Sequence, residues 1–193
     1  KIKNFIFEFE KNKKNPFILE FGVRQGRSTK MFLEICERNN GNLISVDVDD
    51  YASLFNDENW TFIQCRDDNK DKISQFLKKS VDIIFIDSFH DPDHVIKIIN
   101  LNWENLIIGG SMYIDDISWL PYIKNGWREH KYTENINFDT FQILLHLLNS
   151  NKDNFILEFN FQDSGIARLT KLKNVILEKP KKIIRRKNLI KKI

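Results

Sequence analysis

The sequence holds few of the residues that mark specialised structural classes. Its 193 residues include 2 cysteines, Cys36 and Cys65, which are too few for a disulfide framework and lack metal-ligand spacing. The 7 glycines and 4 prolines exclude a collagen-like chain. No apolar run approaches the roughly 18 residues of a membrane span, and the first residues lack the apolar stretch of a signal peptide. We therefore expect no transmembrane segment and a reducing, cytoplasmic location.

Charge is distributed unevenly along the chain. The net charge is +3, but segment 171–193 alone contains ten Lys and Arg residues and one acid, so the rest of the chain is negative. Hydrophobic residues make up 41% and charged residues 30%, as is typical of one soluble globular domain. We expect a folded domain over 1–174 and a basic, flexible tail over 175–193 without further packing contacts. The tail leaves nucleic acid or an anionic membrane open as a partner.

Short apolar runs alternate with helical patterns along most of the chain, as in parallel βαβ units. Near the end, two further strands flank Gln162-Asp163-Ser164-Gly165, a hairpin turn signal. The pattern predicts an α/β fold: a Rossmann-like, doubly wound, mostly parallel sheet of about seven strands, closed by an antiparallel C-terminal hairpin. We expect strands at 17–21, 43–47, 60–63, 81–87, 111–115, 154–161 and 166–172, helices at 28–38, 70–79, 92–105 and 139–150, and a turn at 109–110.

Nearly every predicted strand ends in an acidic residue. In open α/β sheets ligands bind beyond the carboxyl ends of the strands, near the point where the strand order reverses. Acids that gather at one edge repel one another, so a cation or a ligand rich in hydroxyl groups would explain their placement. The residues at these ends are Glu20 with Gly22, Asp47, Asp67 or Asp68, Asp87 with His90, and Asp115 with Asp116.

The first strand leads into a glycine turn of the form E-x-G-x-x-x-G. Gly22 and Gly26 allow a tight turn and close approach of the backbone to a ligand, and Ser28 or Thr29 can cap the following helix. The turn is neither the G-x-G-x-x-G of dinucleotide-binding proteins nor a P-loop. Asp47, at the end of the next strand, is placed to bind both hydroxyls of a ribose. The alternative is an ordinary tight turn and a surface acid.

The glycine turn, the acid at Asp47 and the closing hairpin together resemble the class I S-adenosylmethionine-dependent methyltransferases, over 16–172. The segments 85–90, with Asp87 and His90, and 113–116 resemble the metal-dependent O-methyltransferases, most closely the sugar-modifying group that includes the macrocin O-methyltransferases. The resemblance implies S-adenosylmethionine as cofactor and a sugar or other small hydroxyl compound as acceptor. We expect the cofactor to contact Glu20, Gly22, Gly26, Ser28, Asp47, Asp67, Asp68 and Asp87.

Asp87, Asp115 and Asp116 are the predicted metal ligands. They follow neighbouring strands, and three converging carboxylates cannot all stay ionised without a cation. Oxygen ligands suit Mg²⁺, which lowers the pKa of a bound hydroxyl, and His90 is placed to take the proton. A zinc site between His90 and His94 is disfavoured, because Pro92 should begin a helix after His90. Asp115 and Asp116 alone would indicate an ordinary loop pair.

The acceptor is the least defined part of the prediction. Only about 15 residues precede the first strand, so the N-terminal substrate lid seen in many relatives looks shortened. A nucleic-acid methyltransferase that uses the basic tail, and a non-catalytic binding module of the same fold, remain alternatives, and a homo-oligomer stays open. An aromatic wall against the acceptor, or simple packing, would involve Trp119, Leu120, Pro121, Tyr122, Trp127 and Tyr132.

Overall fold

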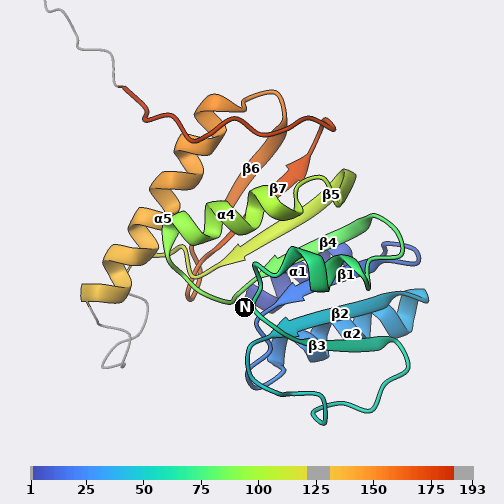
Figure 1. Ribbon diagram of the computed structural model, residues 1–193. Coiled ribbons are helices and arrows are strands. Elements are labelled where there is room, and N and C mark those ends of the chain that lie inside the picture. Colours follow the sequence, from blue (N-terminus) through green and yellow to red (C-terminus); the bar gives the residue numbers. More distant parts are fainter. Residues whose placement is uncertain (1, 121–130, 185–193) are drawn as a thin grey trace, which may run out of the picture.

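The computed structural model describes residues 2–120 and 131–184, and in these residues seven strands form one sheet in the order β3-β2-β1-β4-β5-β7-β6 (Figure 1). Strands β1 to β5 are parallel, whereas β7 runs antiparallel to both β5 and β6. The predicted fold is thereby confirmed. The strands are β1 (Phe17–Phe21), β2 (Asn42–Asp47), β3 (Trp60–Gln64), β4 (Val81–Ile86), β5 (Leu106–Asp115), β6 (Phe155–Asn160) and β7 (Ile166–Lys171).

Helices cover both faces of the sheet. Successive strand residues point to opposite faces, so Ile18 of β1 packs with α1 and α2, while Leu19 packs with α4 and α5. The central strands β1 and β4 are therefore apolar and buried almost throughout, as expected of parallel strands covered on both sides. The helices are α1 (Ile2–Glu10), α2 (Arg27–Asn39), α3 (Lys70–Ser74), α4 (Pro92–Asn102) and α5 (Lys131–Ser150).

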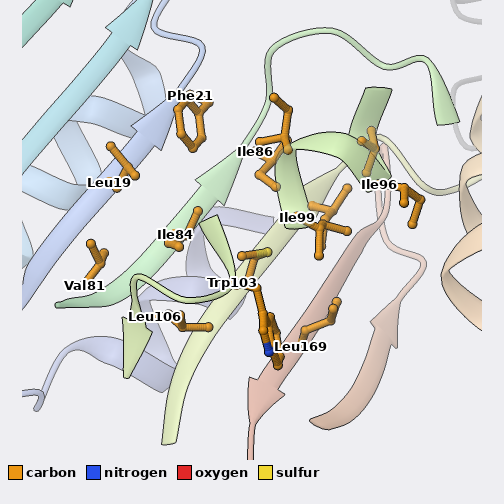
Figure 2. Close-up of a cluster of buried hydrophobic side chains, with 14 of the residues drawn as sticks. Leu19, Phe21, Val81, Ile84, Ile86, Ile96, Ile99, Trp103, Leu106 and Leu169 are labelled. Atoms are coloured by element: carbon orange, nitrogen blue, oxygen red, sulfur yellow. The ribbon is translucent and has the colours of Figure 1, made fainter. Parts of the chain in front are cut away.

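The larger core lies between the sheet and α4. Figure 2 shows Leu19, Ile84 and Ile99 in this layer, with Trp103 and Leu169 beneath the end of α4. Burying each such aliphatic side chain contributes about 1.5–3 kcal/mol relative to leaving it in water. Pro92 begins α4, as the sequence predicted, and the Asp91 carboxylate caps the helix by accepting the backbone N–H of His94 at 2.9 Å. This cap fixes the direction in which the chain leaves β4.

Helix α1 was not predicted, because the alternation of Phe and Glu over residues 7–10 has the two-residue period of a strand. It packs on the same face as α2, where Ile6 is buried. The Tyr113 hydroxyl of β5 donates to Glu10 Oε1 at 2.7 Å, and the Arg168 guanidinium lies 4.0 Å from the centre of the Phe9 ring. These contacts attach helix α1 to β7 and to β5, the strand that carries Asp115.

Two further expectations about secondary structure are wrong. The turn expected at 109–110 lies inside β5, which begins at Leu106 and absorbs the two glycines through a register shift against β4. The expected helix over 70–79 ends at Ser74, because only Ile73 of this segment is buried. None of the helices in 2–120 and 131–184 combines the length and apolarity needed to cross a membrane.

Segment 175–184 makes some contacts with the end of α5, although most of its side chains are exposed. Leu177 is buried, and the segment runs along the C-terminal part of α5 (Figure 1). Asn151 binds the backbone of Glu178 through both its side-chain oxygen and its side-chain nitrogen, and the Lys181 N–H donates to the His146 carbonyl at 3.1 Å. Polar side chains at the end of α5 thus form hydrogen bonds with the backbone of this segment, and the high charge of the segment does not predict them.

Candidate active site at the carboxyl edge of the sheet

A cleft of about 1040 Å³ opens at the carboxyl ends of the parallel strands. It lies where the strand order reverses between β1 and β4, as expected for an open α/β sheet. Ile6 of α1 and Ser164 of the hairpin turn also line it. Of the predicted site residues, the cleft is lined by Gly22, Ser28, Asp47, Asp67, Asp87, His90, Asp115 and Asp116, whereas Glu20, Gly26 and Asp68 lie outside its lining.

Gly22 is required by a backbone contact across the strand-order reversal. Its φ is +94°, a conformation that side chains disfavour, and a Cβ at this position would lie 2.1 Å from the Asp87 carbonyl oxygen. The contact arises because β1 and β4 stay paired to their ends, where the Asp87 N–H donates to the Phe21 carbonyl at 2.8 Å. The glycine turn and the Asp87 carboxylate are therefore held next to each other by main-chain atoms.

Asp47 closes the glycine turn. Its Oδ2 accepts the N–H groups of Val23 at 2.7 Å and Arg24 at 3.3 Å, and its Oδ1 accepts the N–H of Asp49 at 3.1 Å. Arg24 takes a left-handed conformation, with φ +47°, as the turn curls around the carboxylate. Asp47 also lines the cleft. The ribose contact predicted from the sequence stays a prediction, and the carboxylate has a structural task besides it.

Glu20 is fully buried behind the turn. Its Oε2 accepts the hydroxyls of Thr29 at 2.8 Å and Ser45 at 2.6 Å, while its Oε1 has no hydrogen-bond partner among the described residues. Burial raises the pKa of Glu20 to about 7, although the neighbouring hydroxyls, that of Ser28 first, oppose this rise. The expected cap of α2 by Ser28 or Thr29 is wrong. The helix follows Gly26 without a side-chain cap, and Thr29 binds Glu20 instead.

The structure brings Asp87, His90, Asp115 and Asp116 together at one end of the cleft. The His90 Nε2 atom lies 3.4 Å from Asp87 Oδ1 and 3.5 Å from Asp116 Oδ2. Burial, followed by the charges of Asp87 and Asp116, raises the pKa of Asp115 to about 8. Burial would lower the pKa of His90, but the hydrogen bond to Asp87 and the charges of Asp116, Asp87 and Asp115 outweigh it and raise that pKa. This end of the cleft favours a positive charge.

Asp67 and Asp68, adjacent in sequence, face different surroundings. Asp67 Oδ2 accepts the Ser88 hydroxyl at 2.5 Å and lies 2.8 Å from His94 Nε2, and all three side chains line the cleft. Asp68 instead pairs with Arg66 at 3.0 Å and Lys97 at 2.7 Å. Hydrogen bonds from these two cations hold the pKa of Asp68 below its usual range. Of the two acids, therefore, Asp67 is the one placed at the cleft.

In the described part of the chain, one group of three ligand atoms lies within 4.8 Å, and it is Asp67, Asp68 and His94. The predicted ligands Asp87, Asp115 and Asp116 are not as compact. However, Asp68 is already paired with Arg66 and Lys97, so its charge is balanced without a cation. The hydrogen bond of Ser88 to Asp67 and the place of Ser164 in the cleft lining were not predicted, because a lone serine carries no signal in a sequence pattern.

For the aromatic residues after Asp116 the sequence left open a wall against the acceptor or simple packing, and those that are described do not line the cleft. Trp119 packs against Phe138, Phe141 and Phe161, with ring centres 4.6–5.4 Å apart. Leu120 is exposed and Tyr132 is 72% exposed. Trp119 therefore belongs to a packed aromatic cluster between α5 and β6. Pro121, Tyr122 and Trp127 lie outside the described residues.

Known proteins support the methyltransferase resemblance that was inferred from the sequence. Residues 19–117, about half of the chain, match a family model described as a methyltransferase domain. No curated protein matches the sequence. Among solved structures, the MycE methyltransferase of the mycinamycin biosynthetic pathway, in complex with Mg and S-adenosylhomocysteine (SAH), is 18% identical with a TM-score of 0.62. The alignment covers 89% of this chain and 48% of MycE, so the chain spans about half of that protein.

A second solved structure is similar along most of its length. The SAH-bound methyltransferase PaMTH1 of Podospora anserina is 14% identical with a TM-score of 0.69, and the alignment covers 89% of this chain and 78% of PaMTH1. At this identity the likeness shows the shared fold, while the family match covers the glycine turn and the strand ends through Asp116. The chain belongs to the methyltransferase-domain family, with the Rossmann-like fold of S-adenosylmethionine-dependent enzymes.

Proposed function

We propose that the chain transfers the methyl group of S-adenosylmethionine to a hydroxyl oxygen of a small acceptor, of the sugar class, assisted by a divalent cation. The observation that carries the proposal is the set of three carboxylates around His90 in the cleft beside the glycine turn. Strongly shifted pKa values in a cleft are typical of functional sites. MycE, whose fold is similar, is described in complex with Mg, SAH and mycinamycin VI.

The cleft has room for both cofactor and acceptor. Its 1040 Å³ is at the upper end of the roughly 300–1000 Å³ typical of small-molecule sites. The part lined by Gly22, Asp47 and Asp67 offers backbone turns and carboxylates suited to an adenosyl group with its hydroxyl and amino groups. The part lined by Asp87, Asp115 and Asp116 would then receive the acceptor. The methyl group of a bound cofactor would then lie between the two parts.

The donor set at Asp87, Asp115 and Asp116 fits a hard divalent cation. It consists of oxygen atoms alone, which suit Mg²⁺ better than Zn²⁺. The same carboxylates raise the pKa of His90, so the electrostatic potential at this place favours a cation. A bound Mg²⁺ would lower the pKa of an acceptor hydroxyl. His90 would take the hydroxyl proton at Nε2, and the carboxylates of Asp87 and Asp116, 3.4 and 3.5 Å from that atom, would stabilise the imidazolium that forms.

Both cysteines of the chain are unpaired in the structure, Cys36 buried and Cys65 half-buried. This agrees with a reducing environment, and we place the reaction in the cytoplasm.

Two measurements test the proposal. Calorimetry should show binding of S-adenosylmethionine and SAH but not of NAD or ATP. Transfer of labelled methyl groups to a panel of small glycosides should require Mg²⁺ or Mn²⁺ and stop with a chelator. A failure to bind SAH would contradict the proposed cofactor. Methyl transfer that persists after complete chelation would contradict the proposed role of the metal.

A further inference from the structure

The turn between β6 and β7 reaches into the acidic end of the cleft. The Ser164 hydroxyl donates to Asp115 Oδ1 at 3.0 Å, and the Asp116 N–H donates to the same oxygen at 2.8 Å. Ser164 is 8% exposed, so water competes little for this bond. Asp115 Oδ2 accepts no hydrogen bond from the described residues. The two donors thus occupy one carboxylate oxygen and leave the other for the cleft.

Backbone bonds fix the same turn to the segment that follows β5. The Ser118 N–H donates to the Ser164 carbonyl at 2.8 Å, and the Ile117 N–H donates to the Gly165 carbonyl at 3.3 Å. Gly165 has φ +77°, and a Cβ there would lie 2.5 Å from the Ser118 backbone nitrogen and Cβ. Asp116 itself is left-handed, with φ +57°. The hairpin therefore holds Asp115 and the left-handed Asp116 from the side opposite the glycine turn.

We propose that Ser164 is a positioning residue that directs Asp115 toward a divalent cation, so that the hairpin turn forms part of the cation site. This inference rests on the cation named in the proposed function, but it concerns a residue that the family match, which ends at residue 117, does not reach. Residues that hydrogen-bond metal ligands fix their orientation, and losing one typically weakens metal binding about 10–100-fold.

The test is calorimetric titration of the full chain with Mn²⁺ in the presence of SAH. Ser164→Ala should weaken Mn²⁺ binding about tenfold or more and leave the affinity for SAH within about twofold. Ser164→Thr, which keeps the hydroxyl, should restore most of the affinity. Thr170→Ala is the matched control: it removes a half-buried hydroxyl from the same hairpin, away from the cleft, and should bind Mn²⁺ like the wild type.

Three results would overturn the inference. Ser164→Ala could bind Mn²⁺ as tightly as the wild type, or Thr170→Ala could weaken binding equally, which would indicate a general loss of hairpin stability. If the wild-type chain bound SAH but no Mn²⁺, the role of Ser164 and the proposed divalent cation would both be refuted. The proposed methyl transfer from S-adenosylmethionine would not be affected by this result. Absence of SAH binding would instead strike at the proposed function itself.

Discussion

The two ends of the cleft use their acidic residues differently. At β1 and β2, Glu20 and Asp47 are bound to hydroxyls and N–H groups of the protein itself, and they shape the glycine turn. At the ends of β4 and β5, Asp87, Asp115 and Asp116 gather around His90, and burial together with the charges of Asp87 and Asp116 raises the pKa of Asp115. The acids of the first end hold the glycine turn, whereas those of the second end surround the place where we propose that a cation binds. An acid at a strand end is therefore not by itself a ligand-binding residue.

The largest effect should follow from removing the charge at β5. Asp115→Asn with Asp116→Asn should lower methyl transfer at least about 10³-fold, or about 4 kcal/mol of activation free energy. The same variant should unfold at a higher temperature, because it removes a charge that burial first, and then repulsion from Asp87 and Asp116, disfavours at Asp115. Asn also tolerates the left-handed conformation at position 116. Transfer assays and thermal melts measure the two effects, and loss of activity with a lowered melting temperature would contradict this account.

The backbone contact between the two ends should be the next most sensitive feature. Gly22→Ala should cost about 3–4 kcal/mol of stability in urea unfolding, from left-handed strain plus the clash with the Asp87 carbonyl. Gly109→Ala is the matched control. It has a similar positive φ, but a Cβ added there would meet no atom within 4 Å, so it should cost only about 1–2 kcal/mol. Equal costs would show that the contact at Gly22 is unimportant.

Glu20 should make stability depend on pH. Its pKa of about 7 lies above the value of 4.5 for an unperturbed Glu, so the folded state binds the proton more tightly than the unfolded state. This contribution, about 3 kcal/mol, is present below pH 4.5 and is lost as the pH rises through 7. Other groups titrate in the same range, so the comparison is with Glu20→Gln. Urea unfolding at pH 5 and pH 8 should show a smaller loss for the variant, and parallel losses would rule out this role for Glu20.

The smallest effect concerns the two adjacent acids after β3. Asp67→Asn should weaken SAH binding about fivefold, near 1 kcal/mol, because Asp67 lines the cleft with Ser88 and His94. Asp68→Asn should leave SAH binding unchanged, since its partners Arg66 and Lys97 hold it outside the lining. Calorimetry on both variants measures the difference, and a stronger effect at Asp68 would reverse the assignment.

Much of this arrangement follows from sequence patterns, for identifiable reasons. The parallel strands are continuous apolar runs, and the strand ends carry the acids, so the sheet and the positions of Asp87, Asp115 and Asp116 could be predicted. Patterns of this kind do not report which partner an acid finds. Glu20 accepts the hydroxyl of Thr29, and Asp68 pairs with Lys97 outside the cleft lining. Both contacts join side chains of different elements, which a local pattern does not reveal.

Long-range contacts account for the remaining differences. Ser164 lies 49 residues from Asp115 in sequence, and the two meet only because β7 inserts between β5 and β6. Helix α1 is held by Glu10 and Tyr113, which are 103 residues apart. Neither pairing leaves a local signature, so both required the folded chain.

The absence of a side chain at Gly22 has a mechanical consequence. With the main chain of the glycine turn resting directly on the carbonyl of residue 87, no side chain separates the place that we propose for the nucleoside from the place that we propose for the metal ion. Any displacement of one is passed to the other through rigid peptide groups. Attempts to widen the site for bulkier cofactor analogues would therefore have to re-engineer both ends at once.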